Sequence, residues 1–444
     1  MALNQTNQEP NILMFRIFYT LLITLISPLA LYALLKKRSD KPAVGSRWKE
    51  YFGHVSPLKS IASAEDDNRT VVWLHTVSVG EVLGATAFVR ALKKRYPEVS
   101  VVMTTTTTTG AEQVSKLGDL VEHRFMPLDF PWAIRRFIRT IQPNQLLIME
   151  TELWPNTLAV AKQMKVPVSV INARLSQHSA QRYQKLAAIG RFLARHIEHI
   201  YCLHQDDAKR FESLGFTATQ VSVTGSLKFD IQVSEQVIEQ GRKLRAALGV
   251  DRPVWVAAST HQGEDELLLE VHRQVITQLP NALMILVPRH PERFKNVAEL
   301  VVSQGMTCVR RTHAQAVEAQ TQVYLADTMG EMMTVLSASD VCFMAGSLLG
   351  NKVGGHNLLE PAALGLPTIT GPSYFNFTDI TQQLLQAKAT TVCETPEQIA
   401  TTLVGLLNNE SERKAQGQSA LQVVNRNRGS IDKTLTGLFS HEAA

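Results

Sequence analysis

Short apolar runs alternate with helix-like stretches twice along the chain, and this alternation restricts the fold more than any other feature. The first series predicts strands at 71–74, 99–104, 145–149, 166–171, 199–203 and 221–224. After a charged predicted helix at 233–248, the second series predicts strands at 254–258, 283–287, 307–309, 323–325, 341–344 and 368–370. Such alternation builds parallel sheets with helices on both faces. The sequence therefore predicts two doubly wound α/β domains that face each other across a cleft.

Length and composition agree with two globular domains. The chain has 444 residues, 45% of them apolar and 19% charged, which is enough for two separate cores. We expect an N-terminal segment at 1–40, an N-terminal domain at 41–230 and a C-terminal domain at 231–444, whose last helix packs back toward the N-terminal domain. Four scattered cysteines without a CxxC pair indicate core thiols in a reducing compartment.

The N-terminal segment contains an uncharged run of 19 residues from Ile17 to Leu35, followed by Lys36, Lys37 and Arg38. A membrane-spanning helix needs about 20 residues, and basic residues after it favour a cytoplasmic location for the rest of the chain. The run thus predicts a membrane-anchor helix. Pro28 and two threonines weaken a full span, so a monotopic hairpin or an interfacial helix is the alternative.

In the N-terminal half, polar residues follow two predicted strands. Ser78, Gly80 and Glu81 stand where a strand ends and a helix begins, and a carboxylate at that point is suited to act as a general base. The alternative is a favourable acid in the first helical turn.

Glu150 and Glu152 directly follow the predicted strand at 145–149. Two carboxylates beside a buried strand are costly unless they are paired or functional, and Arg174 is the candidate counter-ion. Lys228 follows the last strand of this half and is a candidate partner for a phosphate or carboxylate. Its alternative role is that of an ordinary surface lysine.

In the C-terminal half, a glycine-rich stretch at 345–367 joins a predicted strand to a helix start at Asn357. Backbone N–H groups of such a turn favour anions, and Glu360 on the first helical turn is placed to reach sugar hydroxyls. Polar clusters at 258–264, 288–293 and 327–331 also follow strands, and Arg289 supplies a cation. Together they predict a small-nucleotide site; the alternative is a set of plain turns.

Several function classes are excluded by motifs that the sequence lacks. Asp-x-Asp and HExxH are absent, which argues against a metal-chelating glycosyltransferase or a zinc hydrolase. Gly-x-Ser-x-Gly and Gly-x-x-x-x-Gly-Lys are also absent, which argues against a serine hydrolase or an ATPase. We therefore expect no metal and no cofactor, and no nucleic-acid partner.

Eight ordered motifs together resemble one known family, the 3-deoxy-D-manno-octulosonic acid (Kdo) transferases. The motifs are Ser78-Val-Gly-Glu81, Glu150-Thr-Glu-Leu-Trp-Pro155, Asn172-Ala-Arg-Leu-Ser176, Gly225-Ser-Leu-Lys-Phe-Asp230, Ser259-Thr-His-Gln-Gly-Glu264, Val287-Pro-Arg-His-Pro-Glu-Arg293, Asp327-Thr-Met-Gly-Glu331 and Gly354-Gly-His-Asn-Leu-Leu-Glu-Pro361. The likeness extends to about Leu438. It implies a GT-B glycosyltransferase fold, with two Rossmann-like domains, and inverting transfer of Kdo from CMP-Kdo to a lipid A precursor, lipid IVA.

The resemblance also implies roles for individual residues. Glu81 matches the catalytic base, and Glu150 and Lys228 match positions that support the transition state. The segments that match the CMP-binding residues are Pro288, Arg289, Met329, Gly330, Glu331, Asn357, Leu358, Leu359 and Glu360. Other motif residues are candidate substrate contacts: Ser78, Gly80, Glu152, Arg174, Ser259, His261, Ser347 and His356. The segment 348–353 departs from the family by being longer than usual.

The implied acceptor is a phosphorylated disaccharide embedded in the bacterial inner membrane, so inner-membrane lipid is an expected partner. Residues 41–230 carry 24 Lys and Arg against 17 Asp and Glu, whereas residues 231–444 carry 17 against 21. A basic half suits an anionic membrane surface. We expect Arg182, Lys185, Arg191 and Arg195, on a predicted helix at 180–196, to contact anionic lipid together with Arg135, Arg136 and Arg139.

Two competing functions stay open at this point. One is a related GT-B enzyme that uses a different nucleotide sugar, and a screen of CMP-Kdo against UDP- and ADP-sugars separates it. The other is a catalytically silent, membrane-anchored scaffold on the same fold. The presence of Glu81, Arg289 and Glu360 argues against the scaffold.

Overall fold

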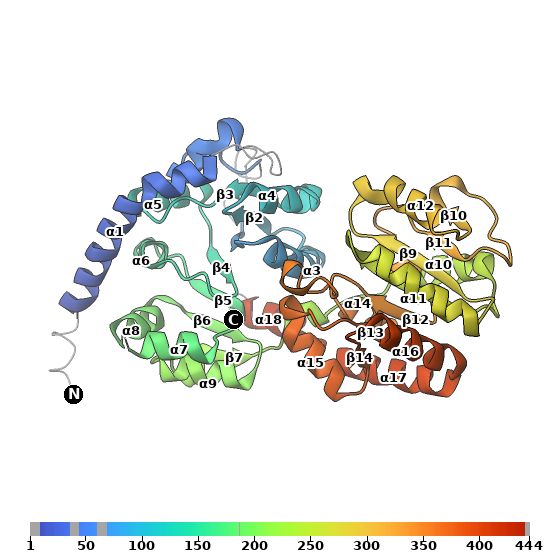
Figure 1. The fold of residues 1–444 in the computed structure, drawn as a ribbon. Coiled ribbons are helices and arrows are strands. Elements are labelled where there is room, and N and C mark those ends of the chain that lie inside the picture. The colour runs from blue at the N-terminus through green and yellow to red at the C-terminus, as the bar shows by residue number, and fades with distance from the viewer. Residues whose placement is uncertain (1–8, 36–43, 60–68, 186, 440–444) are drawn as a thin grey trace. The chain divides into compact units, whose positions relative to one another are not determined.

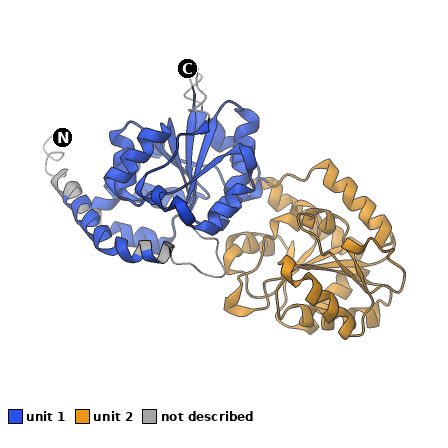
Figure 2. Cartoon of the chain, turned by 90° about the horizontal axis from the view of Figure 1, so that it is seen from above, with its two compact units in different colours: residues 1–230, 428–444 blue, residues 231–427 orange. Residues whose placement is uncertain are grey.

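The computed structural model describes residues 9–35, 44–59, 69–185 and 187–439 (Figure 1). The chain divides into two compact units (Figure 2). Unit 1 comprises residues 1–230 and 428–444, and unit 2 comprises residues 231–427. Each unit is a parallel α/β domain with helices on both faces of its sheet, as the strand–helix alternation predicts. The cleft between the domains stays a prediction.

Unit 1 is built on a seven-stranded sheet in which every pairing is parallel. The strand order is β3-β2-β1-β4-β5-β6-β7. The strands are β1 (Val71–His75), β2 (Ser100–Thr105), β3 (Glu122–Phe125), β4 (Gln145–Met149), β5 (Val168–Ala173), β6 (His199–Cys202) and β7 (Val221–Val223). Strand β3 was missed by the sequence prediction because its residues, Glu-His-Arg-Phe, contain one apolar side chain only.

Two apolar layers cover the faces of this sheet. One contains buried side chains of α5, α6, α8 and α9, and the other contains those of α3, α4 and α18. The helices are α3 (Val79–Arg95), α4 (Thr108–Ser115), α5 (Pro131–Ile141), α6 (Pro155–Gln163), α7 (Gln177–Gln184), α8 (Ala187–His196), α9 (Gln205–Ser213) and α18 (Ser430–Phe439), with the 3-10 turns η1 (Gly45–Phe52), η2 (Gly118–Leu120), η3 (Ala218–Gln220) and η4 (Leu227–Phe229).

The single helix predicted at 180–196 is wrong: the structure has two helices there, α7 and α8. Helix α7 is polar and packs against α9, whereas α8 buries Phe192 and Leu193 and packs against α6 and α1. The two helices also contact each other, and the buried Ala180 of α7 belongs to the same apolar layer as Phe192 and Leu193 of α8. Because there are two helices, Arg182 lies on α7, whereas Arg191 and Arg195 lie on α8.

Unit 2 repeats the architecture with a second seven-stranded parallel sheet, in the order β10-β11-β9-β8-β12-β13-β14. Its strands are β8 (Val254–Thr260), β9 (Leu283–Pro288), β10 (Cys308–Arg310), β11 (Val323–Leu325), β12 (Val341–Met344), β13 (Thr368–Thr370) and β14 (Thr390–Val392). Its helices are α10 (Glu235–Leu248), α11 (Asp265–Gln278), α12 (Phe294–Ser303), α13 (Met332–Ser337), α14 (Leu359–Ala363), α15 (Thr378–Gln386), α16 (Pro396–Asn408) and α17 (Glu410–Asn427), with η5 (Pro291–Arg293), η6 (Arg311–His313), η7 (Gly350–Lys352) and η8 (Phe375–Phe377). Strand β14 was not predicted.

The N-terminal helix α1 (Glu9–Leu35) contains Pro28 and packs against α6 and α8. Within the described ranges, no helix has the length and hydropathy of a bilayer-crossing segment. The predicted basic cluster at Lys36, Lys37 and Arg38 lies outside the described residues. The membrane anchor predicted at 1–40 therefore stays a prediction.

The C-terminal segment returns to unit 1, where α18 packs against α3 and η4. The Asp230 carboxylate caps this helix from almost 200 residues earlier in the chain. It accepts the backbone N–H groups of Gly429 and Ile431, both at 2.6 Å. An acid at a helix N-terminus satisfies donors that have no partner within the helix.

We predict that Asp230→Ala weakens the attachment of α18. Loss of a capping carboxylate costs about 0.5–2 kcal/mol, so amide hydrogen exchange in 430–439 should become faster while exchange in unit 2 stays unchanged. Asp432→Ala is the matched control, because Asp432 is an exposed acid in the first turn of the same helix. Equal exchange rates in the two variants would contradict the capping role of Asp230.

Candidate functional site

The strand order reverses direction once in each sheet. In unit 1 the reversal lies between β1 and β4, and in unit 2 it lies between β8 and β12. Ligands of doubly wound proteins bind beyond the carboxyl ends of the strands at such a point. The segments that follow these four strands hold most of the predicted site residues, including Glu81, Glu150, His261 and His356.

Glu81 lies at the start of α3, immediately after β1. Ser78 and Glu81 form a capping box, in which the Glu81 N–H donates to Ser78 Oγ at 3.2 Å. The Glu81 carboxylate accepts from the Val77 N–H and from the Ser78 hydroxyl, both at 2.9 Å. These bonds hold the side chain in one orientation, so it is both a helix cap and a fixed carboxylate at the switch point.

The electrostatic surroundings of Glu81 favour its protonated form. Burial raises the pKa of Glu81, the Val77 and Ser78 hydrogen bonds oppose the rise, and the Glu150 and Glu152 carboxylates add to it. Three acidic side chains are therefore close enough to interact. A carboxylate with a raised pKa is a stronger base, and such groups are concentrated at functional sites.

Backbone strain marks the same edge of the sheet. Glu150 and Asn172, at the ends of β4 and β5, have positive φ angles of 62° and 53°. A residue other than glycine in this region costs on the order of 1–3 kcal/mol and is typical of functional sites. The Asn172 side chain accepts the Leu227 N–H at 3.1 Å, which ties β5 to the turn that carries Lys228.

Lys228, in η4, lies beside α3; its predicted role stays a prediction. A Cβ atom added to Gly84 would lie 3.8 Å from Lys228 Cε and 3.2 Å from the Met149 methyl group. The absence of a side chain at Gly84 thus lets Met149 and Lys228 pack closely against α3. Arg174 is different: it is exposed, and among the described residues it forms no ion pair with Glu150 or Glu152. Its predicted role as their counter-ion is wrong in this structure.

In unit 2, two imidazole rings join the segments after β8 and β12. His261 and His356 are stacked at 5.1 Å between ring centroids, with 2.8 Å between their Nε2 atoms, so one ring donates a hydrogen bond to the other. Burial and nearby cationic side chains lower the pKa of His261 to about 4 and that of His356 to about 3. Both rings are neutral at pH 7 and supply polar, uncharged contacts.

Glu264 was not among the predicted site residues, yet it organises the glycine-rich loop. Its fully buried carboxylate accepts the backbone N–H groups of Gly346, Ser347 and Leu348, at 2.8, 3.0 and 3.1 Å. It also accepts the His261 N–H at 3.1 Å. The backbone N–H groups of 346–348 in the glycine-rich turn are therefore bonded to a carboxylate of the protein itself, and the predicted binding of a ligand anion at this turn stays a prediction. A carboxylate that ends a Ser-Thr-His-x-Gly-Glu turn is the signal that could have indicated this role.

This arrangement restricts which atoms of the loop remain for a ligand. The Ser347 side chain is fully buried. Its hydroxyl donates to Met344 O and accepts the Gly371 N–H. The side chain predicted to contact substrate therefore exposes no atom in this structure. Ser259 is buried with a φ of 61°, beside an irregularity in the β8–β9 pairing. Both residues shape the backbone that carries His261 and His356.

In the predicted nucleotide-binding segment at 357–360, the helix that the sequence predicts from Asn357 begins two residues later, at Leu359. Helix α14 has five residues, Leu359–Ala363, so its dipole is small. The Asn357 side chain accepts the Leu359 N–H at 3.1 Å, and the Leu358 and Leu359 side chains are buried. Burial raises the pKa of Glu360, whereas Arg289 and Asn357 oppose the rise. Arg289 and Glu360 are thus near neighbours.

The remaining predicted residues lie at the ends of β9 and β11. Pro288 is buried at the end of β9, and Met329 is exposed. Glu331 is paired with Arg311 at 2.6 Å, and Gly330 has a φ of 83°. The long segment at 348–353 forms the 3-10 turn η7, and the Ser373 hydroxyl donates to Gly350 O at 2.5 Å.

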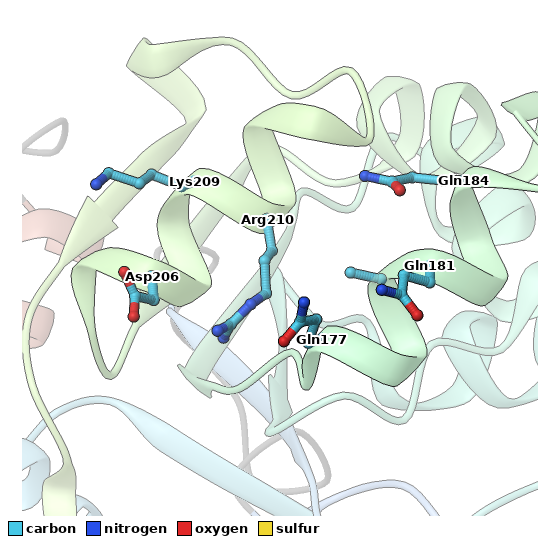
Figure 3. A pocket seen from close by; sticks show the side chains of 7 residues that line it. Gln177, Gln181, Gln184, Asp206, Lys209 and Arg210 are labelled. Atoms are coloured by element: carbon cyan, nitrogen blue, oxygen red, sulfur yellow. The ribbon is translucent and has the colours of Figure 1, made fainter.

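A separate polar pocket of 390 Å³ lies on unit 1 between α7 and α9 (Figure 3). Three glutamines of α7 line it on one side, and Asp206, Lys209 and Arg210 of α9 line it on the other. None of the predicted site residues lines it. Elsewhere within the described residues, no three His, Cys, Asp or Glu side chains gather as metal ligands do, and the absence of a metal requirement stays a prediction.

The fold and the sequence profiles define the class of protein. The profile "Glycosyl transferases group 1" matches residues 251–423. A glycosyltransferase from Rickettsia africae has a TM-score of 0.52 at 12% identity and covers 84% of this chain and 98% of its own. A UDP-N-acetylglucosamine 2-epimerase described as putative, from Listeria monocytogenes, has a TM-score of 0.51 at 13% identity, with 84% and 96% covered. The chain has the two-domain, GT-B-like fold of these proteins.

Sequence relatives then narrow the class to one family. The profile "3-Deoxy-D-manno-octulosonic-acid transferase (kdotransferase)" matches residues 46–231. The 3-deoxy-D-manno-octulosonic acid transferases of Haemophilus influenzae and Bordetella pertussis are 38% and 32% identical to this chain. Both alignments cover 95% of this chain, and they cover 97% and 98% of those proteins. The chain therefore belongs to the Kdo transferase family of glycosyltransferases, as the eight motifs predicted.

We predict that Glu264→Gln destabilises unit 2 and weakens nucleotide binding together. The variant replaces an anion that accepts four N–H groups with an amide whose NH₂ end opposes some of them. A cost of about 2–4 kcal/mol is expected for such a buried charged acceptor. Thermal unfolding and CMP titration measure the two effects. Glu266→Gln, at an exposed acid two residues later, is the control, and equal behaviour of the two variants would refute the assignment.

Proposed function

We propose that this protein transfers Kdo from CMP-Kdo to a lipid A precursor, lipid IVA, with inversion at the anomeric carbon and with Glu81 as the general base. The observation that carries the proposal is the fixed, buried Glu81 carboxylate at the β1/β4 switch point, in a chain that belongs to the Kdo transferase family. The switch point is where doubly wound proteins bind their ligands.

The proposed step is a single displacement. The Glu81 carboxylate takes the proton of an acceptor hydroxyl, and that oxygen forms a bond to the anomeric carbon of Kdo. The bond between this carbon and the CMP phosphate oxygen breaks, and CMP leaves with the electron pair. The burial of Glu81 and its two acidic neighbours support this role, because they raise the proton affinity of the carboxylate.

The leaving CMP is proposed to be held by unit 2 without a metal. Arg289 is exposed next to the Glu360 carboxylate, so it is free to contact a phosphate, while Glu360 is suited to bind ribose hydroxyls. The backbone of 357–359 and of 329–331 and the neutral His261–His356 pair supply further contacts. Fixed dipoles of this kind stabilise developing charge without reorganisation. Glu150 and Lys228 are proposed to support the transition state in unit 1.

We also propose that the protein is attached to the bacterial inner membrane through its N-terminal segment, with both units on the cytoplasmic side. Helix α1 exposes many large apolar side chains, which supports contact with lipid. Of the arginines predicted to dock anionic lipid, Arg139, Arg182, Arg191 and Arg195 are exposed. Arg136 instead donates to Phe52 O at 3.0 Å, so it has a structural task.

We predict that Glu81→Gln lowers kcat by a factor of about 10²–10⁴, the usual contribution of a general base. CMP binding should persist, because the donor is assigned to unit 2. The assay is mass spectrometry of the lipid product, with CMP-Kdo generated in situ and UDP- and ADP-sugars as competing donors. Glu98→Gln, at an exposed acid beyond the end of α3, is the control. Full activity of Glu81→Gln would contradict the assignment of Glu81 as the general base.

We predict further that the loss of activity on the acid side of the pH profile follows the protonation of Glu81. The base acts only when it is deprotonated, so a raised pKa means that activity falls at a higher pH on acidification than an ordinary glutamate would give. Glu152→Gln removes one repelling carboxylate, and the acid-side loss of activity should then move to lower pH. The measurement is kcat/KM against pH for both proteins. A loss of activity that moves to higher pH, or does not move, contradicts this electrostatic picture.

A further inference from the structure

Helix α1 is inverted relative to an ordinary surface helix: its polar side faces the protein and its apolar side faces outward. The partly buried residues recur at helical spacing and are mostly polar, namely Arg16, Tyr19, Thr20, Ile23 and Ser27. The opposite side carries large apolar residues that are exposed, namely Met14, Ile17, Phe18, Leu21, Leu22, Leu25, Ile26, Leu29 and Tyr32. Leu25, diametrically opposite the docked side, is 78% exposed. Exposed apolar surface of this extent marks an interaction site.

The docked side is held by a buried polar cluster. Asp129, just before α5, accepts from the Asn156 and Thr157 N–H groups at 3.0 and 2.7 Å and so caps α6. Tyr19 of α1 also hydrogen-bonds to Asp129. The Asn156 side chain donates to Thr20 Oγ1 at 2.9 Å. The polar side of α1 is therefore a specific part of unit 1.

This attachment determines how α1 meets a membrane. From Arg16 to Ser27 one side of the helix is covered by α6 and α8 of unit 1 (Figure 1). A helix that crosses a bilayer is surrounded by lipid or by other apolar helices. Here the middle of the helix lies along a polar domain, so only one side is left for acyl chains. The geometry fits a helix in the plane of the membrane surface.

Basic residues flank the docked part of α1. Arg135 is close enough to Arg16 to repel it. At the end of α8, the positive charges of Lys162, Arg16 and Arg195 lower the pKa of His196, so these side chains are near one another. Lys162 and Arg195 are exposed. Apolar side chains beside lysine and arginine match the chemistry of an anionic leaflet, in which phosphate groups overlie acyl chains.

We propose that α1 is a monotopic, in-plane helix, whose Phe18–Leu25–Leu29 side enters one leaflet of an anionic phospholipid membrane while its Arg16–Thr20–Ser27 side stays bound to unit 1. The proposal deepens the membrane attachment given above and rests on it. The occupant of the exposed side is lipid, and a second copy of this chain is the competing outcome of the test.

Depth measurements distinguish an in-plane helix from a spanning one. Phe18→Cys and Leu29→Cys carry a fluorescent label, in a Cys308→Ser background because the other three cysteines are buried. The vesicles contain phosphatidylethanolamine, phosphatidylglycerol and acyl-chain quenchers at defined depths. The labels are 11 residues apart, or about 16 Å along a helix axis. We expect equal, shallow depths for both labels; depths that differ by about 16 Å would overturn the proposal.

A pair of neighbouring substitutions tests the apolar side. Leu25→Glu should weaken vesicle binding about tenfold or more, because it replaces a leucine that would be buried in lipid with a charge. Thr24→Glu is the matched control: it adds the same charge one position away, on the flank of the helix, and should change binding less than threefold. The proposal would be refuted if both variants bound vesicles equally well. It would also be refuted if the wild-type chain formed a dimer and did not bind vesicles.

A third assay separates this inference from the proposed enzymatic function. Wild type and Leu25→Glu are compared with a deacylated, water-soluble acceptor, for which membrane contact is not needed. Equal turnover in both, with weaker vesicle binding in Leu25→Glu, supports the in-plane helix. Transfer that is absent from both proteins with CMP-Kdo would refute the enzymatic proposal, while the vesicle and depth results would still decide the role of α1.

Discussion

Parallel pairing of β1 with β4, and of β8 with β12, is the constraint on which the rest of this structure depends. Because all the strands point in one direction, their carboxyl ends and the polar turns after them meet at one edge of each sheet. The reversal of strand order opens a space at that edge, since the connections on its two sides lead to opposite faces. Glu81 and Glu150 flank one reversal, and His261 and His356 flank the other. The strand order of each sheet thus brings the candidate site residues of that unit close together.

Glu264 and Glu81 show how the same type of side chain can have a structural role in one place and a proposed catalytic role in another. Glu264 is surrounded by four N–H donors and accepts them all, so it is fully used as an internal anion that gives the glycine-rich loop its shape. Glu81 is held by fewer donors and lies near two other acids. The pKa of Glu81 is therefore raised by burial and by the neighbouring acids, whereas the Glu264 carboxylate shapes the loop through its hydrogen bonds. A functional carboxylate differs from a structural one in what its surroundings leave unsatisfied.

The sequence predicted most strands because buried parallel strands are continuous apolar runs, as in Leu283–Pro288. It failed where that signal is weak: β3 is largely charged, and Thr390–Val392 is short and half polar. At the site, Glu81, Glu150 and Lys228 each follow a strand of the unit 1 sheet, and their predicted roles stay predictions. The motifs could not show that Glu264 reaches a loop about 80 residues away, or that Arg174 points to solvent. Contacts distant in sequence depend on packing that no local pattern records.

The return of residues 428–439 to unit 1 affects the order in which the two units are completed during synthesis. Ile431, Leu435 and Phe439 belong to the buried layer of unit 1 on the α3 side, yet the ribosome synthesises them after the whole of unit 2. Unit 2 is continuous in sequence and has all its residues before that layer of unit 1 is complete. During translation, apolar side chains on the α3 face of unit 1 therefore stay uncovered until α18 has been synthesised. Unit 1 therefore begins before unit 2 and is completed after it, and a truncation just before α18 would remove part of unit 1 and none of unit 2.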